Sequence, residues 1–387
     1  MRKLPVLVGL VLGLCGCGEE LVEVPQSVVD LPSENECRLD NRGACGEPVT
    51  GEGSAWVWYP VEGTQCQDGS STGFAVRIGT EPGKVMFYLE GGGACYNSWS
   101  CENIFASSYT GDDFSQREDR SVFDTEDAIN PFRAWTHIYI PYCSGDLHTG
   151  SVPYGSGFEG RSHWGYQNIS HFLKRLVPSF ESAERIVLVG SSAGGLGATY
   201  NWSRVQKAFG SIPVDVIDDS GPFLTAEYLD PCFQERMTDV WAQDVMFKEH
   251  CPACLDSGEG FSAQLKQVRQ ELPNRRYALL STSEDFVMRS HYGFAANGCE
   301  RWDEATFASF DETFFADALE AYHDVGSGFE NTFMYEVQGS GHVLLFDDFT
   351  EGLKTESNGV KLSDWLKLFI AGEPLSDVRA SRVVGSN

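Results

Sequence analysis

Positive charge is scarce in this chain. The sequence has 28 Lys and Arg against 56 Asp and Glu, which gives a formal net charge of -28. An acidic surface of this strength repels phosphate backbones and anionic membrane surfaces, so the composition argues against nucleic-acid partners and favours solubility. It also disfavours a free polyanionic polysaccharide as substrate, unless the binding cleft is locally basic.

The sequence also lacks long apolar runs, internal repeats and paired histidines. Beyond the first 17 residues, no segment is apolar for the roughly 20 residues that a membrane-spanning helix needs. No two histidines have ligand spacing on one helix, which argues against a metal hydrolase. We therefore expect no metal and no cofactor.

The N-terminus has the pattern of an export signal. Three residues that include Arg2 and Lys3 precede an apolar stretch over 4–14, which is too short to span a membrane. Because the run 14–17 is similar to a bacterial lipobox, we expect cleavage of a signal peptide (1–16) and lipidation of Cys17. The protein would then be a lipoprotein anchored to the outer membrane or cell surface. An ordinary signal peptide, giving a secreted protein, is the alternative.

The rest of the chain divides by composition. Residues 17–50 are predicted to be an acidic tether with a small loop closed by Cys37 and Cys45. Residues 51–372 have the length of one large catalytic domain, and 373–387 form a C-terminal tail. Nothing in the sequence indicates an oligomeric state.

Ten cysteines follow Cys17, and an even number in an exported chain predicts up to five disulfides. Cys95 and Cys101 are the best local pair. Cys251-Pro-Ala-Cys254 is compatible with a zinc or redox motif. Export and the lack of a second pair at metal spacing favour a disulfide there.

Short apolar runs alternate with amphipathic stretches along the domain. This alternation predicts an α/β fold, a mostly parallel sheet with helices on both faces. Strands are expected at 85–89, 137–140, 186–189, 214–217, 277–280 and 333–337, and helices at 163–178, 194–209, 260–272, 311–323 and 361–371. The aromatic, irregular segments 95–135 and 222–260 are expected to form a loop-rich cap over a site at the carboxyl ends of the strands.

A G-x-S-x-G sequence with Ser192 at its centre lies between a predicted strand and a predicted helix. This context is that of a nucleophile elbow. Side chains at Gly190 or Gly194 would collide with the neighbouring strand and helix, and Ser192 would project above the sheet edge. An ordinary Gly/Ser-rich turn is the alternative.

A serine nucleophile needs a base and an acid, in the chain order Ser, Asp/Glu, His. His342 is the preferred base because it lies on a glycine-rich loop after the last predicted strand. His291, on a loop after a strand, is the main competitor. His250 adjoins the cysteine cluster, and His323 is on an acidic helix.

The acid is expected just past the end of the strand at 277–280. Asp285 holds that position upstream of the base, with Glu284 as its rival. Asp218 and Asp219, which also end a strand, are the second choice. The oxyanion hole should combine the amide of Ala193 with an amide of the glycine-rich loop 89–95.

These residues resemble the pectin acetylesterase / Notum family of serine carboxylesterases, which have an α/β-hydrolase-like fold. The resemblance covers most of 50–345 through the separated blocks 87–97 with Cys101, 130–135, 142–146, 190–195, 218–223, 283–285 and 341–342. It implies that Gly92, Gly93 and Ala193 supply the oxyanion amides. It also implies a triad of Ser192, Asp285 and His342. Plant members carry Trp where this chain has Ala94 and usually Cys where it has Ser191, so acyl preference is not transferred.

The expected function is an exported serine carboxylesterase that works through an acyl-enzyme and removes acetyl groups from esterified polysaccharide. A small ester is the simplest substrate. Tyr96, Trp99 and Trp164 could stack on sugars, although aromatic residues at such positions more often pack in a core or cap. A fatty-acyl or lipid esterase of the same fold is one alternative, and a catalytically inactive surface-binding lipoprotein is another.

Overall fold

The computed structural model describes residues 36–381, apart from 52, 118, 257–259, 300–309 and 347–349. The predicted signal peptide, the lipidation candidate Cys17 and the first part of the predicted tether lie outside the described residues.

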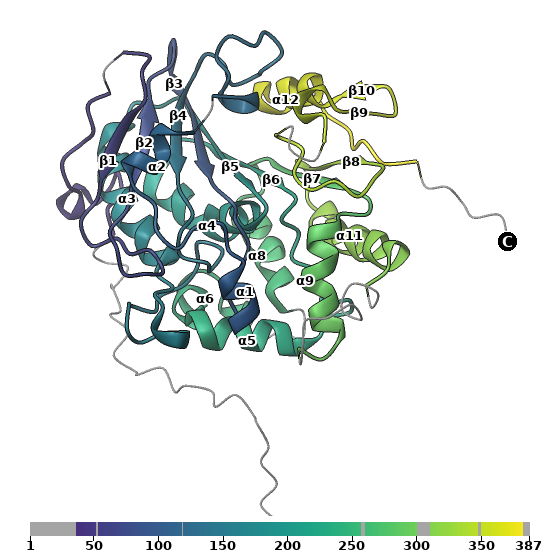
Figure 1. Cartoon of the computed structure of the whole chain (residues 1–387). Helices are drawn as coiled ribbons and strands as arrows, with labels where there is room; N and C mark the ends of the chain where they lie inside the picture. The colour runs from purple at the N-terminus through teal and green to yellow at the C-terminus, as the bar shows by residue number, and fades with distance from the viewer. Residues whose placement is uncertain are drawn as a thin grey trace, which may run out of the picture.

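An eight-stranded sheet forms the centre of the molecule (Figure 1). Its strands are β1 (Val57–Pro60), β2 (Gly73–Arg77), β3 (Glu81–Leu89), β4 (Trp135–Ile140), β5 (Arg185–Ser191), β6 (Val214–Asp219), β7 (Tyr277–Thr282) and β8 (Thr332–Val337). Their order is β1-β2-β4-β3-β5-β6-β7-β8. β1 and β2 are antiparallel to their neighbours, and β4, β3 and β5 to β8 are parallel. All six predicted strands are confirmed, and the antiparallel edge formed by β1 and β2 was not predicted.

Both faces of the sheet are covered, as the apolar strands require. The helices are α1 (Ser98–Glu102), α2 (Gly111–Ser115), α3 (Gly165–Ser179), α4 (Ala193–Phe209), α5 (Pro231–Trp241), α6 (Asp244–His250), α7 (Pro252–Asp256), α8 (Ala263–Glu271), α9 (Phe286–Ala296), α11 (Glu312–Ser327) and α12 (Leu362–Ala371). Ile186 and Leu188 of β5 face a core with α3, α4, α8 and α11, whereas Val187 and Val189 face a second core with α12. This alternation buries successive residues on opposite faces. The α/β-hydrolase-like fold class and the five predicted helices are confirmed.

The two segments predicted to form an irregular cap contain short helices. The first contains α1 and α2, and the second contains α5, α6 and α7. Helices of five to eleven residues have too few turns to display a clear period, so the sequence pattern missed them. The start of α5 carries a local signal, because Asp230 caps it and Pro231 is its first residue. α1, α5 and α9 lie at the same end of the molecule (Figure 1).

Five disulfides link the ten cysteines that follow Cys17. The pairs are Cys37–Cys45, Cys66–Cys143, Cys95–Cys101, Cys232–Cys299 and Cys251–Cys254. The predicted pairs at 37/45 and 95/101 are confirmed, and the C-P-A-C segment forms a disulfide, as favoured over a zinc or redox motif. Disulfides in this number are typical of proteins that fold outside the reducing cytosol.

The ends of the described chain pack on the domain. The Leu39 N–H donates to the Ala208 carbonyl (2.9 Å) at the end of α4, and the Gly46 N–H donates to the Lys174 carbonyl (2.8 Å) in α3. At the other end, the Val378 N–H donates to the Met334 carbonyl of β8 (2.9 Å). The cysteine-closed loop and the first part of the predicted tail therefore belong to the folded body.

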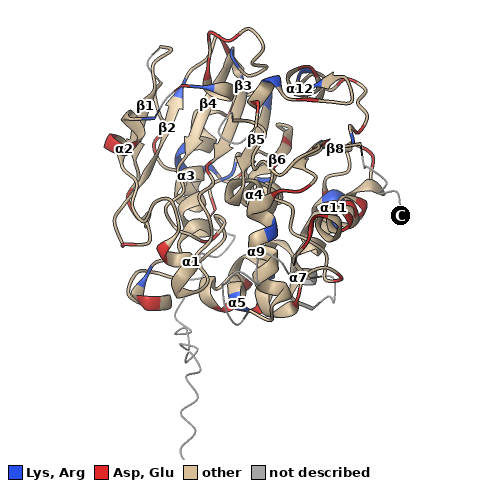
Figure 2. Cartoon of the chain, turned by 45° about the vertical axis from the view of Figure 1, so that its right-hand side comes forward, with Lys and Arg blue, Asp and Glu red and all other residues tan. Residues whose placement is uncertain are grey.

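A short hairpin of β9 (Glu356–Ser357) and β10 (Val360–Lys361) adjoins α12 (Figure 1). Asp and Glu residues are distributed over many elements, including α2 and α11 (Figure 2). Across residues 36–381, with the gaps given above, no helix combines the length and the apolar character needed to cross a bilayer.

Candidate active site

Ser192 lies at the turn between β5 and α4 in a strained conformation. Its φ of 58° and ψ of -122° place a non-glycine residue in a sparsely populated region, which is typical of functional turns. A Cβ atom at Gly190 would lie 1.9 Å from the Gly194 carbonyl oxygen, and one at Gly194 would lie 2.1 Å from the Leu89 carbonyl oxygen. The glycines are therefore required by close backbone approach. The geometry is that of a nucleophile elbow.

His342 and Asp285 come together at the carboxyl ends of β8 and β7. His342 Nδ1 lies 2.8 Å from Asp285 Oδ2 and 3.0 Å from Oδ1. The fully buried Asp285 caps α9 and accepts hydrogen bonds from the Val287 and Met288 amides, both at 3.0 Å. A carboxylate fixed in this way selects the histidine tautomer with the proton on Nδ1, which leaves Nε2 as the basic nitrogen.

The remaining nitrogen of His342 faces the site. Nε2 is buried and has no hydrogen-bond partner within the part of the chain that the structure describes. Ser192, His342 and the backbone of Gly91 to Gly93 line the same cleft. The structure thus pairs His342 with Asp285 and places Ser192 in the same cleft as His342, with no hydrogen bond between Ser192 and His342 among the described residues.

The alternative residues lie elsewhere or have other partners. Glu284 is bonded to Gln338, away from His342. Asp218 accepts hydrogen bonds from Thr199 Oγ1 (3.0 Å) and Tyr277 Oη (2.9 Å) beneath the elbow. Asp219 also has other partners, described below.

His291 lines the cleft beside His342, but its Nδ1 lies 2.9 Å from Tyr96 Oη. Desolvation, with a smaller contribution from the nearby His342, lowers the pKa of His291 to about 4, so the ring is neutral at pH 7. This ring forms a wall of the cleft.

The glycine-rich loop after β3 presents free amides to the cleft. Neither the Gly92 nor the Gly93 N–H donates a hydrogen bond within the described residues, while both carbonyls accept one: from Phe105 N–H (3.0 Å) and Tyr142 Oη (3.0 Å). Ala193 is the first residue of α4, so its N–H has no acceptor within the helix. These three amides are available for an oxyanion.

The loop is fixed by residues that the sequence analysis did not identify. The Tyr142 N–H donates to Glu90 Oε2 (2.9 Å), and the Tyr142 hydroxyl holds the Gly93 carbonyl. Trp241 Nε1 donates to the Cys95 carbonyl (2.6 Å), next to the Cys95–Cys101 disulfide. Tyr142 belongs to the sequence block 142–146, but nothing in the sequence indicates that its side chain contacts the glycine-rich loop. A rigid loop keeps its amides aimed without reorganisation during the reaction.

Two cavities meet at Ser192. A small apolar pocket of about 30 Å³ lies on one side, and its walls include Leu196, Phe233, Met237 and Met288. On the other side is an open cleft of about 920 Å³ with both polar and apolar walls. The cleft walls contain the basic Arg117 and Arg120 and the acidic Glu90, and Arg117 also pairs with Asp119 (2.8 Å).

Of the three aromatic residues proposed to contact sugar, only Trp99 is accessible. Tyr96 is fully buried and Trp164 is 9% exposed, so both pack in the body of the protein. Trp99 is 44% exposed and lines the cleft. Phe105 and Phe286 are also exposed and line the same cleft, and neither was identified from sequence.

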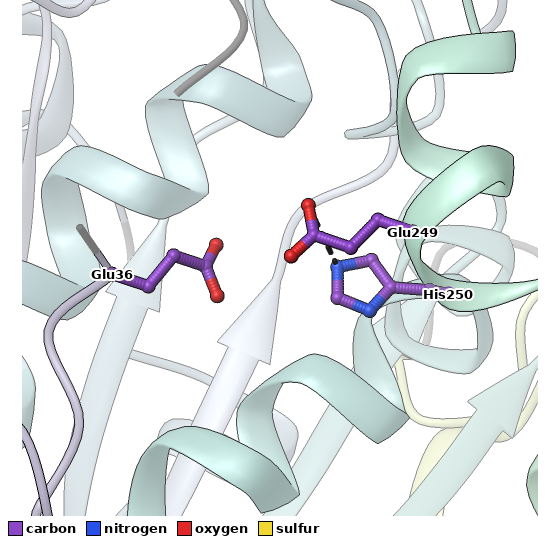
Figure 3. A group of neighbouring side chains, drawn as sticks. All are labelled: Glu36, Glu249 and His250. Carbon is purple, nitrogen blue, oxygen red and sulfur yellow. Dashed lines mark ion pairs between the residues drawn. The ribbon is translucent and has the colours of Figure 1, made fainter. Parts of the chain in front are cut away.

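One group of side chains away from the cleft has the composition of a metal site. Glu36, Glu249 and His250 place one candidate ligand atom each within 4.8 Å of one another (Figure 3). The buried Arg204 guanidinium already pairs with Glu36 at 2.7 Å, and Tyr166 Oη lies 2.9 Å from Glu249 Oε2. The Arg204 guanidinium already supplies the positive charge that a metal ion would bring to these carboxylates. The group is therefore an internal ion-pair network and not a metal site.

Buried ionisable groups predict a loss of stability below about pH 7. Desolvation raises the pKa of Glu90 and Asp218 to about 7 and that of Asp219 to about 6, so the folded protein binds protons there that the unfolded chain does not. The pKa is lowered to about 3 or 4, mainly by desolvation, at His137, His148, His163, His171, His250 and His291. Because these six histidines take up protons in the unfolded chain and outnumber the three carboxyl groups, stability should be nearly constant above about pH 7.5 and should decrease as pH falls from 7 to 5.

Thermal unfolding followed across pH 4.5 to 8.5 measures this profile. An unfolding temperature that rises as pH falls from 7 to 5.5 would show that these histidines are not buried in their neutral form as described.

Comparison with known proteins places these features in a family. The family model described as Pectinacetylesterase matches residues 57–292, more than half of the chain. Palmitoleoyl-protein carboxylesterase notum2 of Xenopus laevis is 28% identical over 176 residues, which is 42% of this chain and 35% of that protein. Palmitoleoyl-protein carboxylesterase NOTUM of Schmidtea mediterranea is 30% identical over 159 residues, 37% of this chain and 28% of that protein. The alignments thus span about a third of these relatives' own length.

Solved structures show the same fold. The Wnt deacylase Notum from Drosophila superposes with a TM-score of 0.62 at 18% identity, covering 87% of this chain and all of that one. The family match spans the glycine-rich loop, the elbow, β6 and Asp285, and it ends before His342. The chain belongs to the pectinacetylesterase family.

Proposed function

We propose that this protein is a serine carboxylic ester hydrolase that forms an acyl-enzyme. Ser192 Oγ attacks the ester carbonyl while His342 Nε2 takes its proton, and Asp285 stabilises the imidazolium that forms. The amides of Gly92, Gly93 and Ala193 receive the oxyanion. His342 then protonates the departing alcohol, and a water activated by the same nitrogen releases the acid.

The size of the apolar pocket is the observation that selects the acyl group. A volume of about 30 Å³ is small beside the adjoining cleft of about 920 Å³, and the pocket walls are apolar, so the pocket suits a short acyl group such as acetyl better than a fatty-acyl chain. The proposed reaction is therefore deacetylation.

The open cleft supports a large alcohol. Its volume of about 920 Å³ is the size of an extended binding site, and its mixed walls suit a sugar chain with hydroxyl groups and apolar ring faces. Arg117 and Arg120 make the wall compatible with carboxylates in spite of the net charge of -28. We infer that the substrate is an O-acetylated polysaccharide.

Release of acetate from an acetylated polysaccharide tests this proposal. Purified residues 18–387 should release acetate from acetylated pectin or xylan, measured by an enzyme-coupled acetate assay against a heat-unfolded control. Hydrolysis of p-nitrophenyl acetate without release of acetate from any polysaccharide would support the esterase activity and contradict the proposed polysaccharide substrate. Absence of both reactions would contradict the esterase.

Replacement of Trp99 by alanine is expected to weaken polysaccharide binding selectively. Removing an exposed aromatic face from the cleft should raise KM for an acetylated oligosaccharide about fivefold, roughly 1 kcal/mol, with little change for p-nitrophenyl acetate. Tyr154→Ala is the matched control, because Tyr154 is 58% exposed and does not line the cleft. An equal rise in KM for both substrates, or no rise, would contradict a sugar-binding role.

We further propose that the protein is exported and anchored through a lipid on Cys17. The lipobox-like run 14–17 and the five disulfides support this location.

A further inference from the structure

Asp219 connects the two halves of the candidate active site. It is the last residue of β6 and is fully buried. Its backbone carbonyl accepts the Ser192 N–H (2.7 Å), and its carboxylate oxygen Oδ2 accepts the Ser191 hydroxyl (3.0 Å). One residue therefore holds the nucleophile elbow through both its main chain and its side chain.

The same carboxylate holds the loop that carries His342. The Leu344 N–H donates to Oδ1 (2.7 Å) and the Leu345 N–H donates to Oδ2 (3.0 Å). Each carboxylate oxygen thus receives an amide from the segment two and three residues beyond His342. The Ser220 hydroxyl, next to Asp219 in the chain, accepts the Val343 N–H (3.1 Å).

The His342 loop needs such an anchor because its backbone is strained. Val343 has a φ of 61°, and a β-branched residue in this region is a genuine outlier. Conformations of this kind cost about 1–3 kcal/mol and persist only where surrounding contacts impose them. The contacts to the amides of this loop come from Asp219 and Ser220, and its Val343 and Gly341 carbonyls accept the Thr350 and Thr282 hydroxyls.

We infer that Asp219 is a positioning residue that sets His342 against Ser192 by anchoring the base loop and the nucleophile elbow to one carboxylate. Its partners on both sides are donors, so the group must be an ionised acceptor. A carboxamide would point its NH₂ group at the Leu344 or Leu345 N–H, and a neutral carboxyl would be a weaker acceptor for these amides. Asp219 is thus a residue outside the triad that holds the catalytic pair of the proposed function in place.

The electrostatic surroundings make this anchor sensitive to pH. Desolvation raises the pKa of Asp219 to about 6. The ionisable groups that face it are Asp218 on the same strand, Tyr88 on β3, and His342, which is paired with Asp285. Since an acid is ionised above its pKa, the anchor is intact above about pH 6 and is lost progressively below it.

Asp219→Asn tests the inference because it keeps the shape and replaces one acceptor by a donor. With p-nitrophenyl acetate, kcat should fall about 100-fold while KM changes less than about twofold, because misplacing a catalytic group affects the chemical step more than binding. Asp215→Asn is the matched control. Asp215 is a buried carboxylate near the other end of β6 that accepts the Arg276 N–H (2.7 Å), so its replacement should affect stability and leave kcat unchanged.

This kinetic test rests on the proposed function, so a second readout is independent of activity. The proton that His342 Nδ1 shares with Asp285 should give a strongly deshielded NMR resonance in the wild type and in Asp215→Asn, and it should broaden or disappear in Asp219→Asn. If the wild type hydrolyses no ester but the resonance depends on Asp219, the esterase proposal fails and the positioning role stands.

Two results would overturn the role of Asp219. One is an Asp219→Asn protein that keeps kcat within twofold of the wild type. The other is a resonance unchanged by the substitution. If Asp219→Asn does not fold, Ser191→Ala removes one donor and leaves the carboxylate. It should lower kcat severalfold at constant KM, and an unchanged kcat would contradict the inference.

Discussion

Replacing Ser192 by alanine is expected to lower kcat for p-nitrophenyl acetate by about 10⁴-fold or more, because no other group can form the acyl-enzyme. The substitution removes one oxygen from a turn whose strained backbone is imposed by Gly190, Gly194 and the Asp219 carbonyl, so the protein should fold normally. Residual hydrolysis should be limited to what the amides of the oxyanion site provide. Steady-state kinetics and thermal unfolding of the two proteins measure both quantities.

Ser203→Ala is the matched control for this experiment. Ser203 lies on α4, as part of the same helix that begins after Ser192, and its hydroxyl donates to Glu271 (2.7 Å) away from the cleft. It should retain wild-type kcat. A folded Ser192→Ala protein with wild-type activity would contradict the nucleophile and favour a catalytically inactive binding protein with activity from a contaminant.

The sequence predicted the centre of this fold because the physical signals there are local. Parallel strands buried on both faces appear as continuous apolar runs, and all six of these runs are strands in the structure. The elbow around Ser192 is defined by its two glycines and its neighbours in the chain. The order of acid and base in α/β-hydrolases then selected Asp285 and His342, which the structure places 2.8 Å apart.

What the sequence did not reveal depends on distant contacts. β1 and β2 have only four and five residues, and Pro60 and Gly73, which are unfavourable within strands, shorten their apolar runs to three residues. Asp219 was considered as the catalytic acid because it ends a strand. Only the structure shows that its carboxylate binds backbone amides more than 120 residues away in the sequence. Glu90 likewise holds Tyr142 by a contact that no local pattern encodes.

The apolar pocket predicts a steep preference for short acyl chains. In the series of p-nitrophenyl esters from acetate to palmitate, kcat/KM should be highest for acetate or propionate and should fall by about 10³-fold or more toward palmitate. Each buried methylene normally contributes about 0.8 kcal/mol of binding, but a chain that overfills a small pocket forces strain of about 1–3 kcal/mol or stays in water. Since the pocket has a volume of only about 30 Å³, we expect a few methylenes to fill it.

Enlarging the pocket should move this preference. Met237 on α5 and Met288 on α9 line the pocket, and Met237→Ala should shift the optimum toward butyrate or hexanoate by removing a flexible side chain from its wall. Met246→Ala is the matched control, since Met246 is equally buried but lines neither cavity. It should lose stability and keep the wild-type chain-length profile.

A profile that instead rises toward palmitate in the wild type would identify a fatty-acyl esterase. The substrate would then be of the kind that the names of the Notum relatives describe, a palmitoleoyl group on a protein. Such a result would mean that the acyl chain extends beyond the small pocket lined by Leu196, Phe233 and Met237. Ester hydrolysis by Ser192 would be common to both outcomes. The chain-length series therefore tests which acyl group is preferred, independently of the catalytic mechanism.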